Sequence, residues 1–165
     1  MIRKVWAAGL AAALAACATV PDTLSYPEAR PYAVTANAPS EVDAALARAA
    51  ASGKRVLLVM GANWCHDSTA LAGWLATPRF AALTAARYDV VYVDVGVPQT
   101  GKGRNLEIAR RFGLDSVPGT PALLVLTADG KLINRDTAAT WRNAASRSEE
   151  AIFAELAALA DKPAP

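Results

Sequence analysis

The chain has 165 residues, of which 53% are hydrophobic and 19% are charged, and its formal net charge is +2. This length allows one domain of ordinary size and leaves no room for a second domain with its own core. The composition is that of a globular protein and excludes an intrinsically disordered chain.

Residues 1–16 have the organisation of an export signal. Arg3 and Lys4 form a short basic region, and the next 12 residues, 5–16, are an uncharged apolar run. A run of this length is too short to span a bilayer, which needs roughly 20 residues, but it fits the apolar region of a secretory signal. The alternative is a buried N-terminal helix, which the Pro-rich stretch that follows would leave without a close partner.

The signal ends in Leu14-Ala15-Ala16-Cys17, which resembles the lipobox of bacterial lipoproteins. The resemblance implies cleavage before Cys17 and lipid attachment to that cysteine. Because residue 18 is Ala and not Asp, it also implies sorting to the outer membrane, with the domain facing the periplasm. Lipidated cysteines of this type carry three acyl chains, and two already suffice for stable anchoring. Ordinary cleavage after Ala18, which would give a soluble periplasmic protein, is the alternative, since residues 16–18 also have a small-x-small form.

Loss of the signal changes the charge of the chain. All 15 acidic residues and 15 of the 17 basic residues lie after Cys17, so the mature chain is formally neutral. A neutral chain has no excess of positive charge to attract phosphates, and we expect no nucleic-acid partner.

The first predicted elements follow a linker. Residues 17–39 contain four prolines and no hydrophobic period, which predicts an extended linker between Cys17 and a domain over residues 40–162. Ser40, followed by acidic residues, predicts the N-cap of a helix that ends at Gly53. Residues 56–60 form an apolar run typical of a strand buried on both faces. A helix over residues 65–76 and a further short helix beginning at Pro78 follow.

The second half of the chain predicts three more strands. The predicted elements are a strand over 88–95, a loop over 96–104, a helix over 105–112, a strand over 122–126, a turn at Asp129-Gly130, a strand over 131–134 and a helix over 148–159. Strands joined through helices must pair in parallel, whereas the tight turn makes the last pair antiparallel. We therefore expect an α/β domain with a mixed sheet of about four strands and helices on both faces. Trp74, Phe80 and Phe112 are predicted core residues, and Trp141 is predicted to cover the surface.

Two motifs resemble the thioredoxin family. One is Ala62-Asn63-Trp64-Cys65-His66-Asp67-Ser68, between a strand and a helix, and the other is Val117-Pro118-Gly119-Thr120-Pro121, directly before a strand. The similarity covers roughly residues 40–160 and implies the thioredoxin-like fold. It also implies a cis-proline at Pro121 facing the reactive sulfur of Cys65, and a backbone at Thr120 that pairs with a bound peptide.

The position of Cys65 favours reactivity on physical grounds. A cysteine at a helix N-terminus meets unpaired N–H groups and the positive end of the helix dipole, which favour the thiolate. Trp64 precedes Cys65, and His66, the only histidine, follows it. His66 is either a polar partner that tunes the thiolate or an exposed residue of the first helical turn. Asp67 suits that turn whatever the chemistry.

The sequence departs from the family at two positions. Ser68 stands where dithiol members carry the second cysteine, and a hydroxyl is too weakly acidic and too hard a nucleophile to replace a thiolate at sulfur. The domain has no other cysteine, since the second of the two in the chain is Cys17. Val59 stands where many thioredoxins carry a buried carboxylate that handles protons for the second thiol. Resolution of a mixed disulfide would therefore need an external thiol.

These patterns predict a monothiol redox protein of the cell envelope. Cys65 would attack disulfides or oxidised cysteines of client proteins, and an external thiol reductant would release the product. The alternatives are a non-enzymatic client-binding or chaperone-like lipoprotein in which Cys65 is vestigial, and a structural lipoprotein that merely has the fold. One histidine and one free thiol fall short of the usual number of metal ligands, so we expect no metal and no other cofactor.

Overall fold

A three-stranded sheet forms the centre of the computed structural model, which describes residues 26–34 and 37–165. Its strand order is β2 (Tyr88–Asp94), β1 (Arg55–Gly61), β5 (Ala122–Leu126). β1 pairs with β2 in parallel, as predicted. It pairs with β5 antiparallel, whereas strands joined through helices were expected to be parallel. The expectation of a mixed sheet with helices on both faces is confirmed. No helix of the described residues is both long and apolar enough to cross a membrane.

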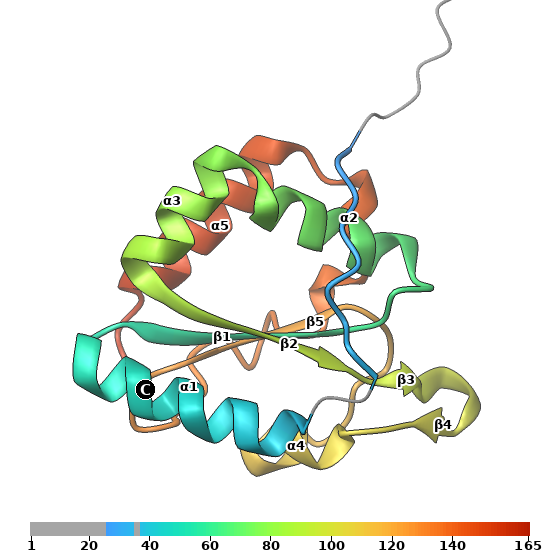
Figure 1. The fold of residues 1–165 in the computed structure, drawn as a ribbon, viewed down its shortest axis with the longest axis horizontal. Helices are drawn as coiled ribbons and strands as arrows, with labels where there is room; N and C mark the ends of the chain where they lie inside the picture. Colours follow the sequence, from blue (N-terminus) through green and yellow to red (C-terminus); the bar gives the residue numbers. More distant parts are fainter. Residues whose placement is uncertain (1–25, 35–36) are drawn as a thin grey trace, which may run out of the picture.

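Helices cover both faces of this sheet (Figure 1). One face carries α1 (Ala38–Ser52) and α4 (Leu106–Arg111), and the other carries α2 (His66–Ala76), α3 (Pro78–Arg87) and α5 (Glu149–Asp161). Successive residues of β1 point into different cores: Leu58 packs on the α1 side, whereas Leu57 and Val59 pack on the α2 side. Both sides of β1 are thus buried, which explains its continuous apolar sequence.

The strand predicted over residues 131–134 is reduced to a single bridge between Leu126 and Leu132. Two backbone hydrogen bonds remain there, from the Ile133 N–H to the Val125 carbonyl and from the Thr127 N–H to the Lys131 carbonyl, both 3.0 Å. A side chain takes the place of the rest of the expected ladder. Asn134 accepts a hydrogen bond from the Val125 N–H (2.8 Å) and donates one to the Leu123 carbonyl (2.9 Å). The amide of Asn134 thus satisfies the outer edge of β5, and the chain leaves the sheet after one bridge.

Several other boundaries differ from the sequence predictions. α1 begins at Ala38, and its N-cap is Asn37, whose side chain accepts from the Ser40 N–H. The predicted loop over 96–104 contains a small hairpin, β3 (Gly96–Val97) and β4 (Lys102–Gly103), with a short 3-10 helix η1 (Pro98–Thr100) at its tip. A further 3-10 segment, η2 (Thr140–Ser146), was not predicted.

Among the large aromatic residues, the prediction for Trp141 is wrong. Trp141 lies in η2 and is fully buried in the core beneath α2 and α5. Phe80 and Phe112 are buried, as predicted, whereas Trp74 is half-buried and packs against the edge of the core. A tryptophan in a short segment without a hydrophobic period gives no sequence signal for burial.

Residues 26–34 form what we call the N-terminal strap, which has no helix or strand and runs along α2 (Figure 1). Tyr32 is 1% exposed, and its hydroxyl donates to the Ser68 carbonyl (3.3 Å). The Ala29 N–H donates to the Thr69 carbonyl (3.0 Å). This part of the segment expected to be a linker is therefore packed on the domain.

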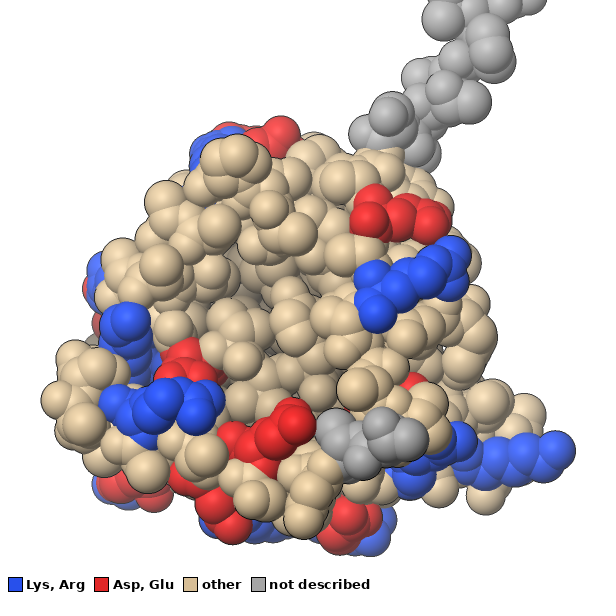
Figure 2. Space-filling model, in the orientation of Figure 1, with Lys and Arg blue, Asp and Glu red and all other residues tan. Residues whose placement is uncertain are grey.

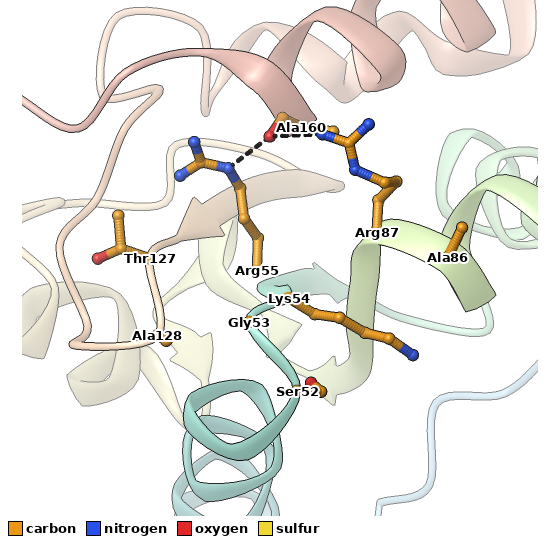
Figure 3. Close-up of a pocket in the computed structure, with 9 residues that line it drawn as sticks. All are labelled: Ser52, Gly53, Lys54, Arg55, Ala86, Arg87, Thr127, Ala128 and Ala160. Atoms are coloured by element: carbon orange, nitrogen blue, oxygen red, sulfur yellow. Dashed lines mark hydrogen bonds between the residues drawn. The ribbon is translucent and has the colours of Figure 1, made fainter.

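Two arginines bind the C-terminal end of α5 at the end of the sheet where β1 begins (Figure 3). Arg55, at the start of β1, and Arg87, at the end of α3, both donate to the carbonyl of Ala160 near the end of α5, at 2.8 and 3.4 Å. The last carbonyls of a helix have no partner within the helix, and cationic side chains satisfy them well. The two guanidinium groups thus tie α5 to β1 and α3.

Several surface charges of opposite sign form ion pairs. Arg48 of α1 contacts Asp89 of β2 at 2.7 Å, and Arg111 contacts Asp43 at the same distance. On the face seen in Figure 2, blue and red side chains lie next to one another around a largely uncharged centre. Charge on this face is therefore interspersed and forms no patch of one sign.

Candidate active site

Cys65 is the N-cap residue of α2 and follows the carboxyl end of β1 by a short turn. The Cys65 N–H donates to the Ala62 carbonyl (3.1 Å), and its carbonyl accepts the Thr69 N–H (2.9 Å), which opens the helix. The thiol is free and only 7% of the residue is exposed. The sulfur thus lies at a helix N-terminus, where unpaired N–H groups are concentrated.

The second motif meets this sulfur because β1 and β5 are antiparallel neighbours. Met60, near the end of β1, pairs with Ala122, the first residue of β5. Thr120 and Pro121, which directly precede β5, are therefore brought to the same end of the sheet as Cys65. The Cys65 thiol donates to the Thr120 carbonyl (Sγ···O 3.3 Å), and the Thr120–Pro121 peptide bond is cis.

Ser68 lies one helical turn after Cys65 and is fully buried. Its hydroxyl has no hydrogen-bond partner among the described residues. Gly61 lies directly beside it: a Cβ built at Gly61 would come within 2.7 Å of both the Ser68 hydroxyl oxygen and the Tyr32 hydroxyl. Val59, two residues earlier in β1, is fully buried and apolar. No carboxylate stands at that position of β1 to accept a proton.

Trp64 is 56% exposed. In the described part of the chain, Val34 is the other large hydrophobic residue that is exposed. Its indole N–H donates to the Gly96 carbonyl in β3 (3.0 Å). Arg104 lies over the same hairpin, with its Nε 3.4 Å from the carboxylate of Asp94. The ring is thus held by one edge against the hairpin while much of its surface faces solvent.

His66 and Asp67 contact each other and not the sulfur. His66 is exposed, and its Nε2 lies 3.3 Å from Asp67 Oδ2. The other carboxylate oxygen of Asp67 accepts from the Ala145 N–H of η2 (2.8 Å). Asp67, which sequence reasoning treated as an ordinary first-turn acid, therefore fastens η2 to the active-site helix.

Asn63 is a site residue whose role the sequence did not indicate. Its side chain accepts from the Tyr32 N–H (3.2 Å) and donates to the Tyr32 carbonyl (2.9 Å). The turn before Cys65 is thus hydrogen-bonded to the N-terminal strap through both backbone groups of Tyr32. Only the position of Asn63 within the motif could have marked it. Cys17, the predicted lipid attachment site, lies outside the described residues.

Comparison with known proteins agrees with this geometry. The sequence model described as "Thioredoxin-like" matches residues 37–128. The chain belongs to the thioredoxin-like family. No curated protein matches the sequence.

Solved structures include relatives of this thioredoxin-like chain. A crystal structure described as a disulphide isomerase from Xylella fastidiosa Temecula1 is 34% identical, with a TM-score of 0.72, and the match covers 81% of this chain and 98% of that one. A solution structure of a thioredoxin from Thermus thermophilus is 27% identical, with a TM-score of 0.51, and the match covers 73% of this chain and 84% of that one.

Proposed function

We propose that this protein carries out thiol–disulfide exchange through a single cysteine, Cys65. The observation that carries the proposal is the position of the sulfur, at the N-cap of α2 and 3.3 Å from the carbonyl before Pro121. The attacking form of a thiol in such an exchange is the thiolate. The resemblance to a disulphide isomerase and to a thioredoxin supports the same chemistry.

The reaction would proceed in two exchanges. In the first, the Cys65 thiolate attacks one sulfur of a client disulfide, so that a mixed disulfide forms and the other client sulfur leaves as a thiolate. In the second, external thiols attack in turn, so that the client sulfur leaves as a thiolate, Cys65 returns to its reduced form and the external thiols leave as a disulfide. Ser68 occupies the place of a resolving thiol but supplies only a hydroxyl, so the second exchange would require a separate molecule.

We further propose that the protein works in the cell envelope, anchored by lipid on Cys17 and facing the periplasm. The support is the basic and apolar leader that ends in Leu14-Ala15-Ala16-Cys17. Client proteins with disulfides or oxidised cysteines are the expected substrates. Disulfides form and persist in this compartment, which agrees with such a role.

The test is adduct formation in a chain with Cys17→Ser, in which Cys65 is the only thiol. Incubation with a disulfide-containing protein should give a covalent adduct at Cys65, seen by mass spectrometry without reductant, that persists until a thiol such as glutathione is added. A Cys65→Ser variant of the same chain is the control. Absence of any adduct would favour the binding module with a vestigial cysteine. An adduct that resolves unaided after the released client thiol has been alkylated would contradict the monothiol mechanism.

In cells, the clients can be identified from the same intermediate. Mixed disulfides linked to Cys65 in the full chain would be isolated after acid quenching, and the partner proteins would be released with reductant. Partners absent from a Cys65→Ser strain would be assigned as clients. A set of partners that does not depend on Cys65 would contradict covalent exchange.

A further inference from the structure

A cavity of about 430 Å³ opens beside the helix end that carries Cys65. Its walls include His66 and Asp67, which directly follow Cys65, and Arg142 from η2. Small-molecule sites in proteins have volumes of about 300–1,000 Å³. The cavity is thus large enough for a small ligand, and it is separate from the contact between Cys65 and Thr120.

Arg142 connects this cavity to the second motif of the site. A Cβ built at Gly119 would lie 2.9 Å from Cδ of Arg142, so the arginine stem lies across Gly119. Gly119 precedes Thr120, whose carbonyl is 3.3 Å from the sulfur. Arg142 thus contacts the chain segment before Pro121 while it also lines the cavity.

The position of Arg142 is fixed by its neighbours in η2. Trp141 is fully buried beneath it. The Ala145 N–H is held by the carboxylate of Asp67 at 2.8 Å. Although Arg142 is itself exposed, the backbone that carries it is anchored to the core and to α2.

Arg142 places a positive charge in the wall of the cavity. Among the described residues, no carboxylate lies within ion-pair distance of Arg142, which is absent from every such pair. Asp67, the acidic residue in the wall, already binds the Ala145 N–H through one oxygen and lies 3.3 Å from His66 through the other. A guanidinium group with no partner presents a planar pair of donors that suits a carboxylate.

We propose that this cavity binds a carboxylate of a small thiol compound whose sulfur exchanges with Cys65, and that Arg142 is its anchor. The inference rests on the proposed thiol–disulfide exchange and names a chemical class for the external thiol. The small thiol enters as the thiolate that attacks the mixed disulfide between Cys65 and a client. The client sulfur leaves as a thiolate, and Cys65 stays bonded to the small thiol until a second molecule of it releases the disulfide.

The last exchange, between Cys65 and the small thiol, can be measured directly in reverse. In the chain with Cys17→Ser, the rate at which Cys65 forms a mixed disulfide would be followed by mass spectrometry with three small disulfides. Glutathione disulfide carries carboxylates, hydroxyethyl disulfide is neutral, and cystamine is cationic. The measured quantity is the ratio of the rate with glutathione disulfide to the rate with each of the other two.

We expect Arg142→Gln to lower the preference for glutathione disulfide over hydroxyethyl disulfide about five-fold at low salt, because electrostatic complementarity acts on association. Added salt should lower the preference in the unsubstituted chain and should have little effect in the variant. The matched control is Arg110→Gln on α4, an exposed residue that likewise has no ion pair with a described residue. It removes the same charge away from the cavity and should leave the preference unchanged.

Two outcomes would overturn the proposal. In one, Arg142→Gln slows the reaction of Cys65 equally with all three disulfides. In the other, Arg110→Gln lowers the preference for glutathione disulfide as much as Arg142→Gln does. Failure of Cys65 to react with any of the three disulfides would instead contradict the proposed function itself. A thermal melt of each variant shows whether the fold is retained. Arg142→Lys, which keeps the charge but not the planar pair of donors, should retain part of the preference.

Discussion

At Ser68, a hydroxyl occupies the buried position one helical turn after Cys65. The residue is fully enclosed by the domain, with Gly61 and Tyr32 beside it. A side chain that cannot reach solvent can interact only with what the protein places next to it. The identity of this one residue therefore decides whether a mixed disulfide can be resolved within the chain.

Replacing Ser68 by Cys should restore internal resolution. In a chain with Cys17→Ser, we expect Ser68→Cys to form a disulfide with Cys65 under oxidising conditions, measured as loss of both free thiols. Turnover should remain slow because Val59 supplies no proton acceptor. The matched control is Thr69→Cys, which moves the new thiol by one residue around the helix. If Ser68→Cys keeps both thiols free, the thioredoxin-like function of this helix end would be in doubt.

Asp67 has a different role on the same turn, because it fastens η2. We expect Asp67→Ala to lower the free energy of unfolding by about 1–3 kcal/mol, since the Ala145 N–H loses its acceptor in a partly buried place. Asp67→Asn keeps an acceptor oxygen and should cost less. Chemical denaturation measures both variants, and equal losses would argue against the hydrogen bond as the cause.

Among the elements, the N-terminal strap depends on a close approach to α2 at Gly73. A Cβ built at Gly73 would collide with the backbone carbonyl of Pro27. Backbone cannot turn away as a flexible side chain can, so the whole strap must shift to make room. The strap and the active-site helix are thus a single packed unit.

Gly73→Ala should displace the strap. We expect a loss of about 1–3 kcal/mol in the free energy of unfolding, the usual cost of overpacking, and faster proteolysis within residues 26–34. Gly119→Ala is the control for stability, because its new methyl group meets only the movable side chain of Arg142. Unchanged proteolysis in Gly73→Ala would show that the strap is not held by this contact.

Different elements were predictable to different degrees. The apolar run of β1 and the positions of Cys65 and Pro121 follow from local sequence, and the structure brings those two residues together. The strap and η2 were missed because long-range contacts hold them, through Tyr32 and Trp141 respectively, and such contacts leave no periodic pattern. The prediction of a fourth strand was wrong for a related reason, since the side chain of Asn134 replaces part of the backbone ladder. In the site, the roles of Asn63 and Arg142 depend on partners more than 20 residues away in the chain.

For the molecule as a whole, buried tyrosines make stability sensitive to alkaline pH. Burial raises the pKa of Tyr92 to about 12, and it also raises the pKa values of Tyr32 and Tyr88. In the unfolded chain these phenols ionise near pH 10. Between the two values the unfolded state has released protons that the folded state still holds, so folding becomes less favourable as pH rises.

We therefore expect a free energy of unfolding that falls from about pH 10 to about pH 12. Tyr92→Phe keeps the ring that packs edge-on against Tyr32 (centroids 5.6 Å apart) and removes the ionisable group. The decline should become shallower in this variant, by at most about 1.4 kcal/mol per pH unit. Denaturation curves across this range test it, and an unchanged slope would exclude Tyr92 as a contributor.

Export of the whole molecule can be tested at its N-terminus. We expect the mature chain to begin at Cys17 and to carry lipid, and Cys17→Ser to release the protein from the membrane fraction. Mass spectrometry of the N-terminal peptide decides the point. An unmodified chain that starts at Thr19 would contradict the anchor and would leave secretion standing.

With lipid on Cys17, the N-terminal strap would also limit how far Cys65 can move from the membrane. Tyr26, its first residue, lines the cavity beside His66, so the chain enters the domain next to the active site. With lipid on Cys17, the nine residues from 18 to 26 would extend over at most about 30 Å. Cys65 would then stay close to the membrane surface, within reach of client segments near the lipid and out of reach of those deep in the periplasm. Lengthening the chain between Cys17 and Tyr26 would enlarge that reach without altering the site.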